Sequence, residues 1–520
     1  MDRPIEKAEK ASCLMKRAAV SVICVLAFVV MLYFSVQSLI VTCDMNLDNG
    51  MRENIDYRFD NVIWNLAAAA AGLVFFYFIR RPLQRVPAFW LGLGLCVYVL
   101  VFGTVWVLSA QSAPTFDSFT VTDAAARAAA GDLSGIDSDY FRYYPFQLGY
   151  VLFSEGLIRL LGLSGNFLAL EVLNVVFLAA AYMAILKCAA LVSGNEEIVK
   201  LSAVLLAGCL PAVLFCTFLY GNIPGFAFAM LSVLAFLLFF EKNRWYHGVL
   251  SAVLLGISVC IKLNNLIFFV AMAIVTVVNL FRTKRELFLR AGYLILAAAM
   301  AVGLKSLPIA VYESRAGISL GDGIPMVSWL AMGLSESPIE DGWYSEDYTV
   351  GNFNENGRDP DAAAGDSLAT IRERLSVFLQ DPAYAIEFFF CKTASQWNEP
   401  SYQSLWTNEV RDHYAQPGAL AEFVLGKGEY AVKGYMDLYQ QFVFAGTALA
   451  AFFCFKRKEL GVSLFLLVLL GGFAYHLLFE AKSQYAMTYF VLMVPLAAYG
   501  FSLMMEKTDI WLSRRKEKKA

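Results

Sequence analysis

Residues 18–41 read AAVSVICVLAFVVMLYFSVQSLIV, an apolar stretch without a charged side chain. A helix of roughly 20 apolar residues is long enough to cross the hydrocarbon core of a bilayer. The preceding segment, MDRPIEKAEKASCLMKR, is basic next to the stretch, and no small-residue cleavage pattern follows it. We therefore predict a signal anchor that is retained in the mature protein.

Apolar segments of this kind recur along the 520-residue chain, at 61–79, 88–110, 167–192, 198–219, 223–240, 246–261, 264–281, 290–312, 440–455, 460–479 and 485–505. Of all side chains 59% are hydrophobic and only 16% are charged, whereas about a quarter are charged in a typical soluble domain. This composition excludes an ordinary soluble enzyme. It predicts an all-α polytopic membrane protein with about twelve transmembrane helices.

The basic clusters set the topology. They lie at Lys7 to Arg17, at Arg80, Arg81 and Arg85, at Lys242 and Arg244, at Arg282 to Arg285, at Lys456 to Lys458, and in the SRRKEKK tail. Twelve spans place all six clusters on one side, which the positive-inside rule identifies as cytoplasmic. The topology is therefore N-in and C-in. It holds only if residues 146–163, which contain Glu155 and Arg159, form an interfacial helix that does not cross.

Four regions follow from this topology. Residues 1–87 hold the anchor and two spans, and residues 88–312 form a transmembrane module with a first outer loop at 111–166. Residues 313–440 form a second extracytoplasmic region, with an amphipathic helix expected around Ser367 to Gln380. Residues 441–520 hold the last spans and the basic cytoplasmic tail. We expect interfacial helices in both outer loops.

Several classes of chemistry lack support in the sequence. The net charge of -3 offers no basic field for nucleic acid. The ten cysteines show no CxxC spacing and lie mostly in apolar segments, so they predict neither a disulfide framework nor a zinc site. There is also no P-loop, no dinucleotide fingerprint and no GxSxG elbow. Soluble nucleotide cofactors are therefore not expected.

Asp117 is the candidate catalytic base, because it closely follows the third span at the outer surface. Transfer of a group to a hydroxyl requires a base for the hydroxyl proton, and a partly desolvated carboxylate suits that role. Alternatively, Asp117 caps a helix that begins near Val121 or is a solvated loop acid.

Further outer-loop candidates follow Asp117. Asp137 and Asp139 precede an aromatic cluster that includes Tyr143 and Tyr144, and Pro145 breaks the helix just before Gln147. These side chains fit a polar substrate docked on aromatic faces, or equally an aromatic belt at the interface. We expect them to face the same outer cavity as Asp117.

Two lysines lie at the predicted outer ends of spans, although lysine and arginine residues are generally enriched on the cytoplasmic side. Lys262 occurs in CIKLNN and Lys482 in FEAKSQYAMTYF. Such ammonium groups could bind a lipid phosphate as point charges. The alternative is that each side chain extends to the headgroups without a ligand.

Together with Asp117, three motifs indicate a family. They are YF..YP.Q.G at Tyr140 to Gly149, DGWY at Asp341 to Tyr344, and FEAKSQYAMTYF at Phe479 to Phe490. The set resembles the GT-C integral membrane glycosyltransferases, and most closely bacterial family 39 members of the protein-mannosyltransferase-like and aminoarabinose-transferase-like group. The resemblance extends from about residue 88 to residue 505.

The resemblance implies transfer of a hexosyl or pentosyl group from a polyprenyl-phosphate-linked donor to a glycan, lipid or protein acceptor, at the outer face of a bacterial plasma membrane. Asp117 matches the first acid of the family's acidic pair, whereas Ser118 stands where the second would be. This departure counts against a mechanism that needs both carboxylates, although Asp137 or Asp139 could supply another. The phosphate would be held by Lys262 and Lys482, with Arg142 as a further candidate. The sugar and lipid paths would be lined by Tyr143, Tyr144, Trp343 and Tyr485.

Metal dependence stays open, since the outer acids could hold Mg²⁺ or Mn²⁺ or act without a metal. Two other functions also stay open. A flippase or transporter for lipid-linked sugars has a similar number of spans, although transporters concentrate polar residues near the bilayer midplane. A non-catalytic polysaccharide-assembly protein would account for Ser118 in place of an acid.

Overall fold

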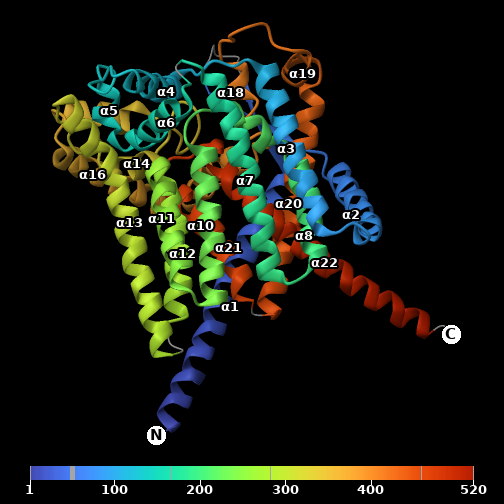
Figure 1. The fold of residues 1–520 in the computed structure, drawn as a ribbon. Helices are drawn as coiled ribbons and strands as arrows, with labels where there is room; N and C mark the ends of the chain where they lie inside the picture. The colour runs from blue at the N-terminus through green and yellow to red at the C-terminus, as the bar shows by residue number, and fades with distance from the viewer. Residues whose placement is uncertain (1, 47–52, 164, 281–282, 458, 519–520) are drawn as a thin grey trace.

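Helices make up most of the structure, a computed structural model that describes residues 2–46, 53–163, 165–280, 283–457 and 459–518 (Figure 1). Each of the twelve apolar segments coincides with helical structure. The corresponding elements are α1 (Asp2–Ile40), α2 (Val62–Gln84), α3 (Ala88–Ala110), α7 (Phe167–Ser193), α8 (Glu196–Gly208) with α9 (Leu210–Leu214) and η2 (Phe215–Thr217), α10 (Asn222–Lys242), α11 (Trp245–Ile261), α12 (Leu266–Val278), α13 (Lys284–Ala316), α20 (Glu429–Arg457), α21 (Leu460–Leu478) and α22 (Ser483–Glu517).

Within the described residues, nine helices are long and apolar enough to cross a membrane. A tenth span results if α8 and the segment Leu210–Thr217, which are bent by 55° at their junction, are counted together. The two remaining apolar helices, α11 and α12, are shorter. The prediction of an all-α polytopic membrane protein is confirmed.

The short pair α11 and α12 has a consequence for Lys262. With 17 residues, α11 rises about 26 Å, less than the roughly 30 Å of a hydrocarbon core. Lys262 follows the last residue of α11 and precedes the turn η3 (Leu263–Asn265). We therefore expect the Lys262 backbone to lie at the membrane boundary, not in an extended loop.

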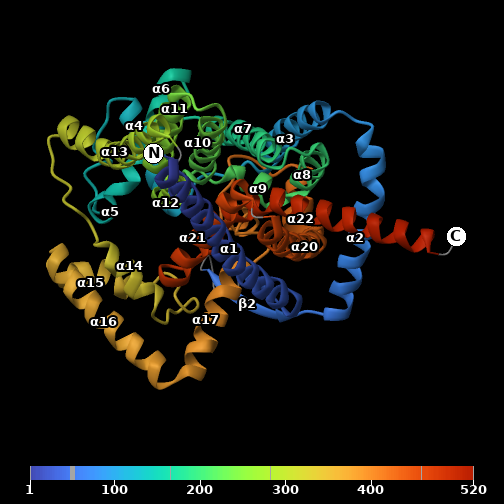
Figure 2. The same cartoon turned by 90° about the horizontal axis from the view of Figure 1, so that it is seen from below.

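The core of the bundle surrounds α22, which packs against α20 and α8, while α20 packs against α1 (Figure 2). Every residue from Ala486 to Gly500 is buried. A Cβ added at Gly500 would lie 2.2 Å from the carbonyl oxygen of Gly446 on α20. Small residues thus let the backbones of α20 and α22 approach closely, as is common between helices in membranes.

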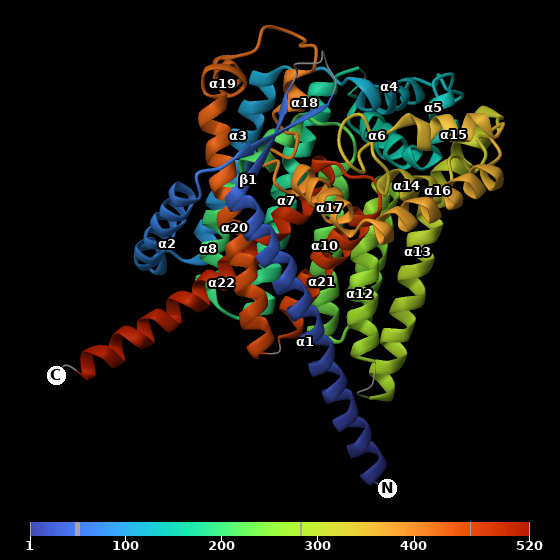
Figure 3. The ribbon, with the colours of Figure 1, turned by 180° about the vertical axis from the view of Figure 1, so that it is seen from behind.

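A two-stranded antiparallel hairpin, which the sequence analysis did not predict, connects α1 to α2. Its strands are β1 (Val41–Asn46) and β2 (Asn54–Phe59), with Val41 opposite Phe59 and Asn46 opposite Asn54. Val41, Thr42, Cys43 and Met45 are buried, whereas Asp44 and Asn46 are only partly buried, so the face that carries Val41, Cys43 and Met45 is covered along its length. The backbone N–H of Cys43 donates to the carbonyl of Asn398, so β1 lies beside the end of α17 (Figure 3).

The two predicted outer loops contain helices gathered at one end of the bundle (Figure 1). The first loop forms α4 (Phe116–Ala129), α5 (Asp139–Tyr143), η1 (Pro145–Gln147) and α6 (Leu148–Leu161). The second forms α14 (Met326–Gly333), η4 (Glu346–Tyr348), α15 (Val350–Glu355), α16 (Pro360–Gln380), α17 (Pro382–Trp397), α18 (Trp406–Glu409), α19 (Ala419–Glu422) and the π-helical turn η5 (Phe423–Lys427). The expected amphipathic helix around Ser367 to Gln380 is the C-terminal part of α16.

The segment that was expected not to cross, 146–163, contains the 14-residue helix α6. Its Glu155 is only 3% exposed and anchors α6 to α13. Tyr312 donates a hydrogen bond of 2.6 Å to Glu155, and both terminal nitrogens of Arg315 donate to its carboxylate at 2.8 and 2.9 Å. Glu155 and Arg159 are therefore involved in packing α6 among the outer helices.

The chain ends lie at the opposite end of the bundle from these loop helices, as do the start of α13 and the end of α20, both of which carry basic residues (Figures 1 and 3). The α2–α3 connection shares this end through an ion pair between Arg80 and Asp509 on α22. One end is therefore rich in basic residues, and the other carries the two loop regions.

Candidate active site

Asp117 lies in the first turn of α4 and is solvent-exposed. The helix begins at Phe116 after Thr115, so Asp117 is not the cap of a helix that starts near Val121. Its Oδ2 accepts a hydrogen bond of 3.1 Å from the hydroxyl of Tyr220. Although one side is open, burial by the surrounding protein raises the pKa of Asp117, against the opposing effects of Lys482, Tyr220 and Lys262. Asp117 is therefore an accessible carboxylate with enhanced basicity.

Ser118, where the sequence resemblance predicts a second acid, has a packing role. It is 1% exposed, and its hydroxyl donates to the carbonyl of Leu219 at 2.9 Å. This bond holds the start of α4 against the segment that carries Tyr220.

Tyr220 connects Asp117 to Tyr140 and Gln147 of the same outer loop, and it was not predicted from the sequence. Its hydroxyl lies 3.2 Å from that of Tyr140 and accepts from the amide of Gln147 at 2.5 Å. Gly221, the next residue, has a φ of +82° and would place a Cβ 2.9 Å from the carbonyl oxygen of Ile261. A glycine at this close turn is the sequence signal that marks the position of Tyr220.

Lys262 lies against the same tyrosine. Its Nζ is 4.1 Å from the centroid of the Tyr220 ring and 5.7 Å from that of Tyr485, distances typical of cation–π contacts. Burial lowers the pKa of Lys262 to about 7, although Asp117 and Glu480 oppose the shift. Lys262 is thus a cation held between two aromatic rings beside the candidate base.

Lys482 immediately precedes α22 and forms an ion pair of 2.5 Å with Glu53. Burial alone would lower the pKa of Lys482, but Glu53 and Glu480 raise it overall. Burial raises the pKa of Glu480 to about 7, and Tyr485 donates to its carboxylate at 3.3 Å. We define the outer-end cluster as Asp117, Tyr220, Lys262, Glu480, Lys482, Tyr485 and Glu53.

The DGWY motif fixes the segment that carries Glu480 and Lys482. The carbonyl of Gly342 accepts from the backbone N–H of Ala481 at 2.8 Å. Lys392 is fully buried, and its ammonium donates to the carbonyls of Phe479, at 2.8 Å, and Gly333. Trp343 is also fully buried and donates to Ser395 at 2.9 Å, so the structure places it within the packing of this region.

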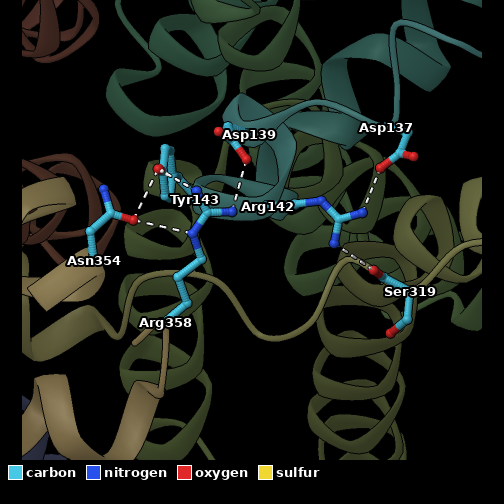
Figure 4. A network of polar contacts seen from close by, with 7 residues as sticks. All are labelled: Asp137, Asp139, Arg142, Tyr143, Ser319, Asn354 and Arg358. Carbon is cyan, nitrogen blue, oxygen red and sulfur yellow. Dashed lines mark hydrogen bonds and ion pairs between the residues drawn. The ribbon is translucent and has the colours of Figure 1, made fainter. Parts of the chain in front are cut away.

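A second polar network gathers other candidates from the first outer loop (Figure 4). Arg142 pairs with Asp137 at 2.5 Å and donates to the carbonyl of Ser319. Arg358 pairs with Asp139 at 2.8 Å and donates to the hydroxyl of Tyr143 at 3.0 Å.

These contacts tie α5 to the second outer loop. The structure thus groups Asp137, Asp139, Arg142 and Tyr143 separately from the contacts of Asp117. Tyr144 packs against Trp329 of α14, with ring centroids 5.9 Å apart.

Candidate metal ligands occur elsewhere. Among the residues that the structure describes, the one group of three such side chains within 4.8 Å of one another is Glu340, Asp341 and Cys391. Asp117 does not belong to it. The use of Mg²⁺ or Mn²⁺ by the outer-end cluster stays a prediction.

Replacing Gly149 of the YF..YP.Q.G motif by Ala should destabilise the protein. A Cβ at Gly149 would lie 1.7 Å from the carbonyl oxygen of Cys260, two residues before Lys262. We expect Gly149→Ala to lower the free energy of unfolding by about 1–3 kcal/mol, measured as a lower thermal unfolding temperature in detergent. The matched control is Gly156→Ala on the same helix, where nothing lies within 4 Å of the added carbon. Equal unfolding temperatures for the two variants would contradict this prediction.

Comparison with known proteins gives three findings. The model of a family described as conserved hypothetical integral membrane protein matches residues 13–505. A comparison with curated proteins finds no match. Among solved structures, the archaeal oligosaccharyltransferase AglB from Archaeoglobus fulgidus, in complex with an inhibitory peptide and a dolichol-phosphate, is similar at 13% identity and a TM-score of 0.40. The similarity covers 81% of this chain and 52% of that one, so this chain spans about half the length of AglB.

Proposed function

The chain belongs to the family of conserved hypothetical integral membrane proteins, and from this premise we propose that it is a membrane glycosyltransferase. It transfers a sugar from a polyprenyl-phosphate carrier to an acceptor at the outer face of the membrane. The observation that carries the proposal is the solvent-exposed Asp117, hydrogen-bonded to Tyr220, whose ring lies against Lys262.

The proposed reaction is a single displacement. The acceptor oxygen attacks the anomeric carbon, the bond from that carbon to the phosphate oxygen breaks, and the acceptor proton passes to Asp117. The phosphate departs as a stable anion, so it needs no general acid. Lys262 and Lys482 balance the negative charge that develops on it, as preorganised charges do in other transfer reactions.

The predicted topology supports a reaction outside the cytoplasm. Under the positive-inside rule, the basic end of the bundle is the expected cytoplasmic end. A bacterial plasma membrane fits the sequence resemblance. Attack from the face opposite the phosphate inverts the anomeric centre, by the same geometry as in inverting glycosidases. NMR of product made from a donor of defined configuration tests this, and retention would exclude the one-step scheme.

Sugar transfer is distinguished from transport by a leaflet-specific assay. Proteoliposomes receive labelled lipid-linked sugars in the leaflet that faces the outer-loop end of the protein. We expect the label to leave the carrier and polyprenyl phosphate to accumulate. Intact lipid-linked sugar in the opposite leaflet would identify a flippase instead.

The pH dependence of kcat/KM should be bell-shaped, because Asp117 must be ionised and Lys262 must be protonated in the free enzyme. Activity falls as the pH decreases through the raised pKa of Asp117. It also falls as the pH increases through the pKa of Lys262, about 7. Since an arginine stays protonated to far higher pH, Lys262→Arg should move the alkaline limb upward. An unchanged alkaline limb in this variant would show that Lys262 does not set it.

A further inference from the structure

Glu53 forms an ion pair with Lys482, one of the two lysines that the proposed function assigns to binding the donor phosphate. Its Oε1 lies 2.5 Å from Nζ of Lys482 and accepts from the amide of Gln403 at 2.9 Å. The side chains of Lys482 and Glu53 are only 19% and 10% exposed. Glu53 directly precedes β2, so it comes from the hairpin that precedes the resembling part of the chain. The Glu53 carboxylate is thus already paired with the Lys482 ammonium group to which a phosphate of the donor would bind.

The charges of the outer-end cluster are unfavourable for simply adding a phosphate. The cluster contains three carboxylates, of Asp117, Glu480 and Glu53, and the two ammonium groups of Lys262 and Lys482. An incoming phosphodiester would bring a further negative charge into a partly buried site, where repulsion is weakly screened. If the phosphodiester displaces the Glu53 carboxylate from Lys482, the charge next to Lys482 stays the same, because each of the two groups carries one negative charge.

We propose that Glu53 is an internal competitor for the anion position at Lys482, and that the phosphate of the lipid-linked donor displaces it. This inference rests on the proposed function. In the resting protein Glu53 keeps Lys482 paired. When the donor binds, the Glu53 side chain leaves Lys482 and the phosphate takes its place. When the carrier departs, Glu53 pairs with Lys482 again.

Binding of polyprenyl phosphate to the full-length protein in nanodiscs tests the proposal. Glu53→Gln removes the charge but keeps an oxygen that can accept from Gln403. We expect this variant to bind polyprenyl phosphate about tenfold more tightly, which corresponds to about 1.4 kcal/mol. If Glu53 instead orients Lys482 for the phosphate, the variant binds more weakly, and that result overturns the proposal. Unchanged affinity overturns it as well.

Two further variants isolate the effect. Asp56→Asn changes an exposed acid on β2, the strand that begins directly after Glu53, and should leave the affinity unaltered. The double variant Glu53→Gln with Lys482→Met should not bind polyprenyl phosphate more tightly than the wild type, because the Lys482 ammonium group is absent. Thermal unfolding of each variant verifies that it is folded.

A second probe separates recognition of phosphate from recognition of lipid. Inorganic phosphate should compete more effectively in Glu53→Gln than in the wild type if the phosphate group itself is recognised.

Failure of this inference is distinguishable from failure of the proposed function. If polyprenyl phosphate binds the wild type but Glu53→Gln gives no gain, only the competitor role is wrong. If it binds no variant, the assignment of the phosphate to this site is wrong.

Discussion

Asp117→Asn should lower the rate of sugar transfer by about 10²- to 10⁴-fold, the usual contribution of a positioned base. The amide oxygen of Asn can take the place of Oδ2 and still accept from Tyr220, but the amide cannot take up the acceptor's proton. Binding of the lipid-linked donor should therefore be retained. Transfer from a labelled donor, measured together with donor binding, distinguishes these two quantities.

The control for Asp117→Asn is Asp132→Asn, since Asp132 is an exposed acid of the same outer loop whose ion pair with Arg127 lies at the surface. It should retain full activity. If Asp117→Asn transfers sugar at the wild-type rate, Asp117 is not the base. If both variants lose activity, the loss comes from a general effect of changing acids in this loop and not from the missing Asp117 carboxylate.

Lys262→Met should reduce kcat by about 10²- to 10³-fold, as expected when a preorganised group that stabilises developing charge is removed. The apolar methionine side chain can still pack between the rings of Tyr220 and Tyr485, so a loss of activity would report the missing charge. Lys262→Arg should recover part of the rate. The measurement is single-turnover release of polyprenyl phosphate from donor bound in advance.

Lys305→Met on α13 provides the matched control, because Lys305 is an exposed lysine of the same module. It should retain the wild-type rate. Normal turnover by Lys262→Met would remove Lys262 from the reaction, and Lys482 would then be the remaining lysine candidate for the departing phosphate.

The membrane architecture could be predicted from the sequence because a bilayer constrains each span locally. A segment such as 18–41 must be apolar along its whole length, and its backbone polar groups must be satisfied within the helix. The same local requirement predicted the nine helices among the described residues that are long and apolar enough to cross, but not that α11 and α12 would be shorter than a full span. The non-crossing of 146–163, predicted from charge asymmetry, stays a prediction. The bend between α8 and α9 was not predicted, because an apolar pattern does not record where a helix changes direction.

The composition of the outer-end cluster could be predicted only in part. Asp117, Lys262 and Lys482 stood out because charges are unusual at the ends of apolar segments. Tyr220, marked only by the neighbouring Gly221, and Glu53 were not predicted, because their importance comes from contacts with residues distant in the sequence. The hairpin that carries Glu53 lies between the predicted spans 18–41 and 61–79, where the sequence analysis assigned no structure.

The separate grouping of Asp137 and Asp139 likewise depends on tertiary contacts. From their position near Tyr143 and Tyr144, both acids were expected to face the same outer cavity as Asp117. In the structure Arg142 and Arg358 neutralise them (Figure 4). Arg358 comes from the second outer loop, and no local pattern predicts that pairing.

The most direct test of the account is a cryo-EM structure of the full-length protein with polyprenyl phosphate bound. We predict that the phosphate lies between the ammonium groups of Lys262 and Lys482, next to Asp117, and that Glu53 no longer contacts Lys482. Phosphate bound elsewhere, for example at Arg142 and Arg358, with the Glu53–Lys482 pair intact, would contradict the account.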